Sequence, residues 1–328
     1  MFDLRRVLRD RALVEQLLEQ LEGPASEEVL AVAQVAADPL KSAVESISHG
    51  QACDLTAEQE AIILAHGRPV LYVQDDTFDP SNVLPVWRDA LSLARARLER
   101  VIPSVGRIEL RGHPRFSWVG TGWLIAPRVV VTNRHVAEVF GHRTDAGCAF
   151  RADPVGKRMR ARLDMYQEHQ RASESEFQVK DILHIEPPDG HDVALLRVAP
   201  LDDDDRELPA PIVLADHDPV ADLKVGAIGY AAWDGSRNER DVMDRIFDGV
   251  YDVKRVHPGE IVEVEPRFAT HDCSTLGGNS GSAMIDLATG EAVALHFAGR
   301  YEQRNYAVKA STLRAILDDA GVDIARGA

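Results

Sequence analysis

The sequence predicts a mainly β protein with a small α-helical bundle in front of it. Through the first 66 residues, apolar side chains recur at helical spacing, and glycine or proline interrupts the runs. From residue 105 onward the pattern changes to short runs that alternate apolar and polar residues, which is typical of strands. We therefore expect a helical domain at 1–66, a connecting strand and helix at 67–103, and a β domain at 104–320.

Four short amphipathic helices are expected in the helical domain, at about 2–21, 26–37, 39–50 and 56–66. The last of them has a capping-box pattern, because Thr56 precedes Gln59 by three residues. A bundle of this size is only marginally stable by itself. We therefore expect it to dock on the rest of the chain or on a partner.

The connecting segment and the β domain divide into further elements. A short strand is expected at 70–73, a polar turn at 75–82, and a helix at 83–102. A weakly helical insertion is expected at 233–248, a closing helix at 311–319, and only surface strands and loops at 141–180. Strands are expected at 105–110, 118–125, 129–135, 192–198, 224–230, 251–254, 261–264, 292–297 and 306–308.

Composition and charge disfavour several function classes. The net charge is −16 and the isoelectric point is near 5.2, which argues against binding a polyanion through a broad basic surface. No apolar run is as long as a membrane span, and the N-terminus lacks a secretory apolar core. The scattered Cys53, Cys148 and Cys273 indicate free thiols in a reducing compartment. We expect a cytoplasmic protein that binds neither nucleic acid nor membrane.

The stretch Gly277-Gly278-Asn279-Ser280-Gly281-Ser282 is the first candidate for chemistry. A serine hydroxyl is a poor nucleophile at neutral pH unless a base takes its proton and donors hold the oxyanion that forms. The glycines let backbone N–H groups turn toward one small space beside Ser280. An ordinary turn has the same composition, so this stretch alone leaves both interpretations open.

Two upstream segments favour the catalytic interpretation. A β-branched run that starts at Val129 ends at His135, and Asp192 stands at the head of the apolar run 193–198. A base, an orienting carboxylate and a nucleophile thus occur in the order His135, Asp192, Ser280. Each residue alone also fits a structural role, as a core histidine or a turn carboxylate, but their joint occurrence favours a catalytic triad.

These segments resemble the T-A-A-H-C, D-I-A-L-L and G-D-S-G-G signatures of trypsin-like (chymotrypsin-fold) serine peptidases. The resemblance covers about residues 104–316, and the G-N-S-G-S form is most similar to the bacterial glutamyl endopeptidase branch. It implies two six-stranded antiparallel β-barrels. An α/β-hydrolase is disfavoured, because that fold orders its triad as serine, acid and histidine and uses G-x-S-x-G.

The aspartate run at 202–205 is expected to be an exposed linker between the two barrels. A metal site is the alternative, but the run lacks the glycine and the distal glutamate of an EF-hand loop. We therefore expect no metal and no cofactor.

The resemblance also implies catalytic roles. Ser280 is the nucleophile, His135 acts as general base and then as general acid, and Asp192 fixes the imidazole tautomer. The N–H groups of Gly278 and Ser280 form the oxyanion hole.

The implied substrate-binding residues favour an acidic side chain before the scissile bond. Ser274 stands where trypsin has the aspartate that attracts lysine or arginine. Thr275 and His296 match the positions that bind the acidic side chain in glutamyl endopeptidases, and Phe297 and Gly299 complete the expected set. A small polar or apolar pocket, with His296 only structural, is the alternative.

Two departures from the family concern control of activity. Asn279 replaces the aspartate that pairs with the new N-terminus of activated trypsin, so activation of that kind is not expected. The region 1–103 precedes the β domain, which makes control by this region or by a bound partner a reasonable hypothesis. The helical domain is then either a passive stabilising cap or an adaptor, as in bacterial effector and defence proteins. For the whole chain, a catalytically silent binding protein is the alternative to a serine endopeptidase.

Overall fold

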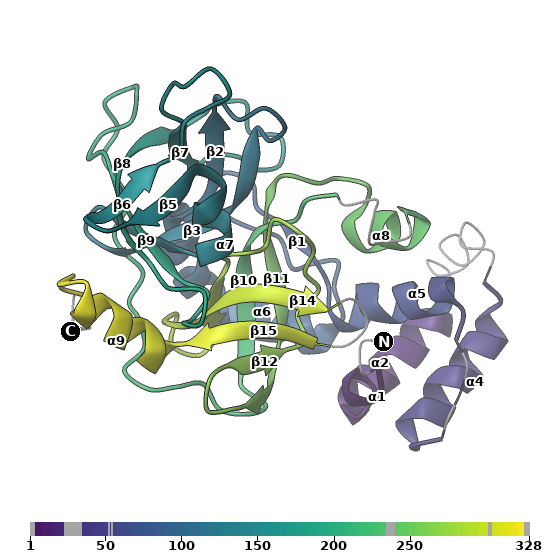
Figure 1. The fold of residues 1–328 in the computed structure, drawn as a ribbon. Helices are drawn as coiled ribbons and strands as arrows, with labels where there is room; N and C mark the ends of the chain where they lie inside the picture. Colours follow the sequence, from purple (N-terminus) through teal and green to yellow (C-terminus); the bar gives the residue numbers. More distant parts are fainter. Residues whose placement is uncertain are drawn as a thin grey trace.

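The computed structural model describes residues 4–22, 35–51, 53, 55–233, 240–300 and 304–324. Two β-barrels lie side by side, the N-terminal helices gather at one end of the molecule, and helix α9 (Ala310–Asp319) lies at the other end (Figure 1). The N-terminal helices come before the strands of both barrels in the chain, so the expected order of a helical region followed by a β domain is confirmed.

No helix within these ranges is long and apolar enough to cross a membrane.

The first barrel is closed by six antiparallel strands in the order β2-β3-β4-β9-β8-β7. These strands are β2 (Val105–Arg111), β3 (Trp118–Ala126), β4 (Val129–Thr132), β7 (Arg160–Asp164), β8 (Glu176–Ile185) and β9 (Ala194–Val198). A hairpin of β5 (Gly141–Thr144) and β6 (Gly147–Phe150) stands outside the barrel. The poorly patterned segment 141–180 thus supplies β7 and the start of β8 to the barrel wall.

The second barrel is a ring of β11-β10-β13-β14-β15-β12 that closes where β12 pairs with β11. Its strands are β10 (Lys224–Tyr230), β11 (Lys254–Val264), β12 (Ala269–His271), β13 (Ala283–Asp286), β14 (Ala292–Arg300) and β15 (Arg304–Lys309). The short strand β1 (Leu71–Tyr72) of the connecting segment adds to β11 outside the ring. The prediction of two six-stranded antiparallel barrels is confirmed.

The expected pair of strands at 251–254 and 261–264 is wrong. The single strand β11 runs through Pro258 and Gly259, which pair with Gly226 and Val225 of β10. A Cβ on Gly259 would lie 2.7 Å from Sγ of Cys273, so the close approach of the next segment requires glycine here. The Pro-Gly pair therefore marks close packing within a strand and not a turn.

The N-terminal helices are α1 (Leu4–Val7), α2 (Arg11–Glu22), α4 (Ala37–Ser48) and α5 (Ala57–Gly67). The expected single helix at 2–21 is in fact two helices, because Asp10 accepts hydrogen bonds from the N–H groups of Ala12 and Leu13 and so caps a new helix. The expected helix at 26–37 falls mainly on residues outside the described ranges. The capping box of Thr56 and Gln59 is present at the start of α5.

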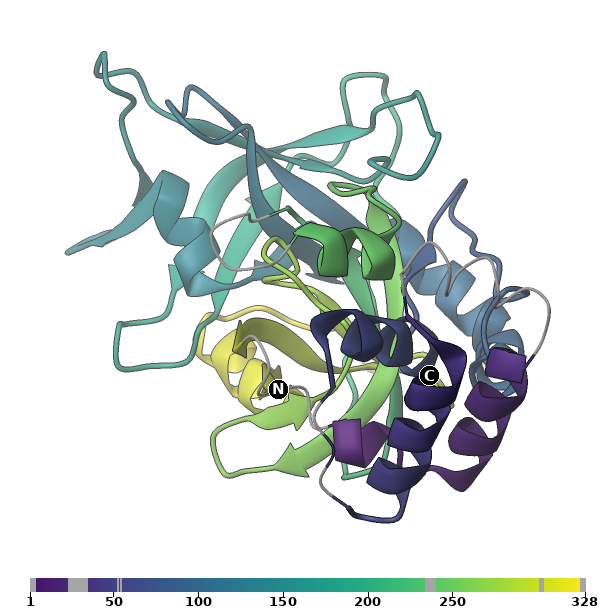
Figure 2. The ribbon, with the colours of Figure 1, turned by 90° about the vertical axis from the view of Figure 1, so that its right-hand side faces the viewer.

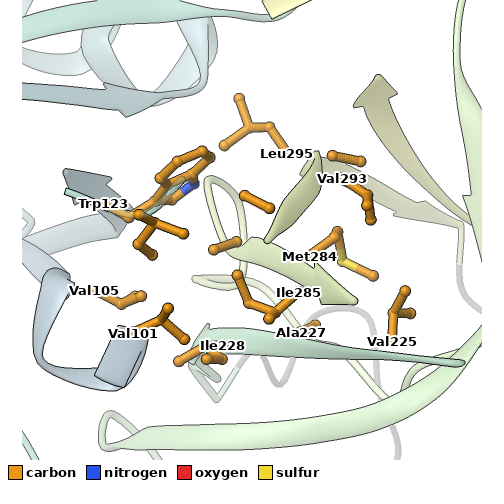
Figure 3. Packing of buried hydrophobic residues seen from close by; sticks show 14 of the residues in the cluster. Val101, Val105, Trp123, Val225, Ala227, Ile228, Met284, Ile285, Val293 and Leu295 are labelled. Atoms are coloured by element: carbon orange, nitrogen blue, oxygen red, sulfur yellow. The ribbon is translucent and has the colours of Figure 1, made fainter. Parts of the chain in front are cut away.

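The connecting helix α6 (Pro85–Val101) contributes to the largest apolar core, which lies mainly in the second barrel and extends to strands of the first (Figure 3). Val101 of α6 and Trp123 of the first barrel pack in one cluster with Ile228 and Met284 of the second. Burial of one large apolar side chain stabilises a fold by about 1.5–3 kcal/mol. This shared core fixes the position of one barrel relative to the other.

The N-terminal helices share a second core with the β domain. Helix α8 (Arg240–Phe247), inserted between β10 and β11, packs beside α5, and both views place it next to the N-terminal helices (Figures 1 and 2). We call this cluster the N-terminal core; its buried members are Leu4, Val7, Leu8, Leu13, Val14, Leu17, Leu21, Leu40, Val44, Ile47, Ala61, Ile62, Ile63, Leu64, Leu84, Ala231, Met243, Ile246 and Phe247. The helices are thus docked on the β domain.

The aspartate run at 202–205 is only partly the exposed linker that was expected. Asp202 is buried, and its Oδ1 accepts hydrogen bonds from the N–H groups of Asp204 and Arg206, so it organises a turn. The other three aspartates are exposed. Among the described residues, no group of histidine, cysteine or acidic side chains is arranged to hold a metal ion.

Candidate active site

Strand pairing in the first barrel brings His135 and Asp192 together. β4 and β9 are antiparallel, and Thr132 at the end of β4 pairs with Ala194 at the start of β9. Residues just beyond these positions are therefore neighbours at the barrel rim. Nδ2 of Asn133 donates to the main-chain oxygen of Asp192 at 2.9 Å, which fixes the arrangement.

His135 lies on a helix and not on the strand where it was expected. β4 ends at Thr132, and the helix α7 (Arg134–Phe140) begins two residues later, so His135 stands in its first turn. Val136, Ala137 and Phe140 of α7 are buried, whereas the His135 side chain is 47% exposed. A substrate can therefore reach the imidazole.

Asp192 binds His135 through both of its carboxylate oxygens. Oδ2 lies 2.6 Å from Nδ1 of the His135 ring, and Oδ1 accepts from the main-chain N–H of His135 at 3.0 Å. Burial alone would raise the pKa of Asp192, but the hydrogen bonds and charge of His135 outweigh it and hold the pKa below its ordinary value. An ionised Asp192 favours the tautomer in which Nδ1 carries the proton and Nε2 can accept one.

The loop between β12 and β13 carries Ser280 to the first barrel. The N–H of Thr121, on β3, donates to the carbonyl of Ser280 at 2.8 Å, and Oγ1 of Thr132 donates to the carbonyl of Thr121 at 2.7 Å. Gly281 is required here because its φ is +92° and a Cβ would lie 1.9 Å from the carbonyl oxygen of Thr121. Ser280 is thus connected through Thr121 to the end of the strand that leads to His135.

The structure does not join all three candidate catalytic residues by hydrogen bonds. His135 and Asp192 are bonded directly, whereas no hydrogen bond links the Ser280 hydroxyl to His135 in the part of the chain that the structure describes. The N–H of Gly281, the residue after Ser280, donates to the carbonyl of His296 at 2.9 Å, so the Ser280 loop lies beside β14. In substrate-free enzymes such bonds are often long and tighten when substrate binds.

The main chain beside Ser280 presents two hydrogen-bond donors. Gly278 has a φ of +81°, and a Cβ there would lie 2.5 Å from the ring of Trp118, so only glycine fits. Its carbonyl accepts from Oγ1 of Thr121 at 2.8 Å, which holds the Gly278–Asn279 peptide unit between the two donors. Within the described ranges, the N–H groups of Gly278 and Ser280 donate to no other group. They are therefore free to bind an oxyanion.

A sequence profile of the trypsin-like peptidase domain matches residues 120–295, which include His135, Asp192 and Ser280. The chain belongs to this family. A search of curated proteins found none that matches this chain significantly in sequence.

Solved structures with a similar fold include the Rv3671c protease of M. tuberculosis, in an inactive form (19% identity, TM-score 0.44) and in an active form (20%, TM-score 0.46). These alignments cover 71% and 72% of this chain and 96% and 89% of the M. tuberculosis chains. The serine endoprotease from Yersinia pestis is 17% identical, with a TM-score of 0.46, over 68% of this chain and 65% of that chain.

Thr275 and Gly299, two of the residues expected to bind substrate in this trypsin-like peptidase, both lie beside Asn305. Oγ1 of Thr275 donates to Oδ1 of Asn305 at 3.0 Å, and a Cβ on Gly299 would lie 2.6 Å from the same oxygen. Nδ2 of Asn305 donates to the carbonyl of Cys273 at 2.7 Å. These bonds tie β15 to the segment that precedes Ser280.

Ser274 and Phe297, which also belong to the expected substrate-binding set, make contacts with other parts of the protein. Ser274 is buried, and its hydroxyl donates to the main-chain oxygen of Arg68 at 2.8 Å, so it faces the connecting segment. The ring of Phe297, on β14, lies 6.1 Å from that of Tyr306 on β15 and is half-buried. Phe297 therefore packs against its neighbouring strand.

His296 is buried and faces a second histidine. Its Nδ1 lies 2.9 Å from Nε2 of His271 on β12. Burial, with the charges of His271 and His135 adding to it, holds the pKa of His296 well below its ordinary value. Burial likewise lowers the pKa of His271 to about 3. Both rings are therefore neutral at pH 7 in the substrate-free protein.

Three residues near the site were missed by sequence reasoning. Asn305 had a weak signal, as a polar residue at the start of an apolar strand, and Trp118 had one as an aromatic residue at the start of β3. Arg68 had none, because its partners lie about 200 residues away in the sequence and its own surroundings resemble an ordinary helix end.

Proposed function

We propose that this protein is a serine endopeptidase that acts through Ser280, His135 and Asp192. The observation that carries the proposal is the 2.6 Å contact between Nδ1 of His135 and the carboxylate of Asp192. The connection of the Ser280 loop to the same barrel, and membership of the trypsin-like peptidase family, support the same chemistry.

In the proposed mechanism, Nε2 of His135 takes the proton of Ser280 while Oγ attacks the carbonyl carbon of the scissile peptide bond. The N–H groups of Gly278 and Ser280 bind the oxyanion, and each such donor contributes about 2.7–4 kcal/mol to transition-state stabilisation. Imidazolium then gives its proton to the leaving amine, and an acyl-enzyme remains on Ser280. Water, deprotonated by His135, attacks the acyl group and releases the second product.

A catalytically silent peptidase-fold protein is the second candidate function. It is favoured by one observation, the lack of a hydrogen bond between the Ser280 hydroxyl and His135 in the described residues. The two candidates differ in whether the hydroxyl is activated, which can be measured directly.

A fluorophosphonate probe is expected to label the native protein at Ser280, because this reagent reacts with a serine that has a positioned base and an oxyanion hole. Mass spectrometry of the labelled peptide checks the position. Heat-unfolded protein and the Ser280→Ala variant serve as controls and should remain unlabelled. A native protein that the probe leaves unmodified would favour the silent candidate.

For specificity we propose a preference for Glu or Asp before the scissile bond. If His271 donates from Nε2 to Nδ1 of His296, the remaining ring nitrogen of His296 carries a proton. That Nε2 has no hydrogen-bond partner among the described residues, so it is free to donate to a carboxylate. Thr275 and Asn305 supply further uncharged polar groups on the adjoining wall.

Peptides that differ only in the residue before the scissile bond test this preference. We expect kcat/KM for the Glu peptide to exceed that for the Leu peptide by about 10- to 100-fold, the value of a hydrogen bond to a charged group. His296→Leu should remove this ratio mainly by lowering turnover of the Glu peptide. Equal turnover of both peptides by the unchanged protein would support the small polar or apolar pocket instead.

The setting of the activity is also a proposal. We propose an intracellular bacterial protease of a regulatory or defence system, whose N-terminal helices bind a protein partner. The docking of these helices on the β domain through the N-terminal core supports a connection between partner binding and the peptidase site. Affinity capture with Ser280→Ala, which should retain substrates, identifies partners and substrates together.

A further inference from the structure

Arg68 joins the connecting segment to the part of the second barrel that leads to Ser280. It lies between α5 and β1 and is only 3% exposed. Its Nη2 donates to Oδ2 of Asp272 at 2.6 Å and lies 3.6 Å from Oε2 of Glu260. Trp87 covers the guanidinium at 5.1 Å and donates from Nε1 to the carbonyl of Gly67 at 2.8 Å. Burial opposes the charge of Arg68, but Asp272 and Glu260 outweigh it and raise the pKa of Arg68.

Arg68 holds residues 272–274 through its main chain as well as through its side chain. The carbonyl of Arg68 accepts from Oγ of Ser274 at 2.8 Å. The carboxylate of Asp272 also accepts from the N–H of Glu260, on β11, at 2.7 Å, so it bridges Arg68 and the barrel. The next residue is Thr275, which is expected to bind substrate and whose Oγ1 donates to Asn305.

The N-terminal core holds the other end of the same segment. Leu276 packs against this core, to which Ala231 belongs. The carbonyl of the next residue, Gly277, accepts from the N–H of Ala232 at 2.7 Å. Residues 272–277 are therefore fixed at one end by Arg68 and at the other by the N-terminal core.

Within the loop around Ser280, the N–H of Asn279 donates to the carbonyl of Leu276 and the N–H of Ser282 donates to the carbonyl of Asn279, but the side chains add little. Asn279 is buried and uncharged; its Oδ1 accepts from Oγ of Ser282 at 3.2 Å, and its Nδ2 has no hydrogen-bond partner in the described part of the chain. The glycines at 277, 278 and 281 give the unrestrained loop many conformations, and ordering them costs conformational entropy. Contacts from outside the loop therefore help to select its conformation: Thr121 and His296 bind its tip, and Arg68 and the N-terminal core hold its base.

We propose that Arg68 is a positioning residue for the peptidase site, because it holds residues 272–274 at the base of the loop, and this base sets how the N–H groups of Gly278 and Ser280 face the substrate. The N-terminal region is then a built-in activator, which takes the place of the ion pair that Asn279 cannot form. This inference rests on the proposed endopeptidase function.

The test is Arg68→Met in the full chain, since methionine keeps much of the apolar stem and removes the charge. We expect kcat/KM and the rate of fluorophosphonate labelling to fall together by about 100-fold, the effect of losing one oxyanion donor. The loss should be mainly in kcat. In the Ser280→Ala background, amide hydrogen exchange over 272–282 should become at least about tenfold faster, with the first barrel unchanged.

Arg171→Met is the matched control. Arg171 binds Glu168 at 2.9 Å and Asp76 at 3.1 Å, so it also joins the connecting segment to a barrel. It makes no contact with residues 272–280 in the described structure. Activity should therefore change by less than about twofold. Arg68→Lys keeps the charge and should recover part of the activity that Arg68→Met loses.

An Arg68→Met variant that folds and keeps both the original kcat/KM and the original exchange rates would overturn the proposal. If this variant does not fold, Asp272→Asn removes the same ion pair from the other side, and unchanged turnover there would also overturn it. An unmodified protein that fluorophosphonate does not label counts against the endopeptidase function. In that case the hydrogen-exchange comparison still tests whether Arg68 holds residues 272–282 in place, because it does not depend on turnover.

Discussion

Replacing Ser280 by alanine is expected to lower kcat for a peptide substrate by about a million-fold, the loss seen when a triad nucleophile is removed. The residual rate comes from substrate binding and from the oxyanion hole, which the variant keeps because its two donors are main-chain groups. KM should change little, since the Ser280 hydroxyl makes no contact that fixes the pocket in the described structure. A fluorogenic peptide assay at saturating substrate measures the effect.

Ser282→Ala is the matched control for this variant. Ser282 lies two residues from Ser280 and is buried, with its hydroxyl bonded to Asn279. Loss of one such neutral hydrogen bond should lower kcat by less than about tenfold, and the fluorophosphonate should still react. If Ser280→Ala kept the original kcat while Ser282→Ala lost it, the nucleophile would have been assigned to the wrong serine.

Much of the fold was predictable because local periodicity coincides with burial. In α6, the apolar positions Trp87, Leu91 and Leu98 recur at helical spacing, and all three are buried. That His135 and Asp192 lie side by side was predictable for a similar reason. His135 closely follows one apolar strand and Asp192 precedes another, and the pairing of β4 with β9 turns these positions into neighbours.

The features that were missed depend on tertiary contacts. Pro258 and Gly259 have the composition of a turn, but packing against Cys273 keeps them inside β11. Asp10 divides the first helix by capping, which a continuous apolar pattern hides. The partner of Arg68 is Asp272, and nothing near either residue in the sequence indicates the other. Such a contact can be found only once the fold is known.

Asp192→Asn is expected to lower kcat by about ten-thousand-fold, because it places the proton on the wrong nitrogen of His135. In the unchanged protein, Oδ1 of Asp192 accepts from the main-chain N–H of His135 while Oδ2 binds Nδ1. The single oxygen of an asparagine side chain would keep the main-chain bond, so its NH2 group would face Nδ1. Nδ1 must then accept, which leaves the proton on Nε2, where a base is needed. The peptide assay used for Ser280→Ala measures kcat.

Asp189→Asn provides the control, since Asp189 is exposed in the same loop and its main-chain oxygen accepts from Arg267. Removing its charge should leave kcat within about twofold. Circular dichroism and thermal unfolding should show that Asp192→Asn is folded, because the main-chain bonds of β4 and β9 do not involve its side chain. The pairing of His135 with Asp192 would then be structural and not catalytic if the folded Asp192→Asn variant retained the original kcat.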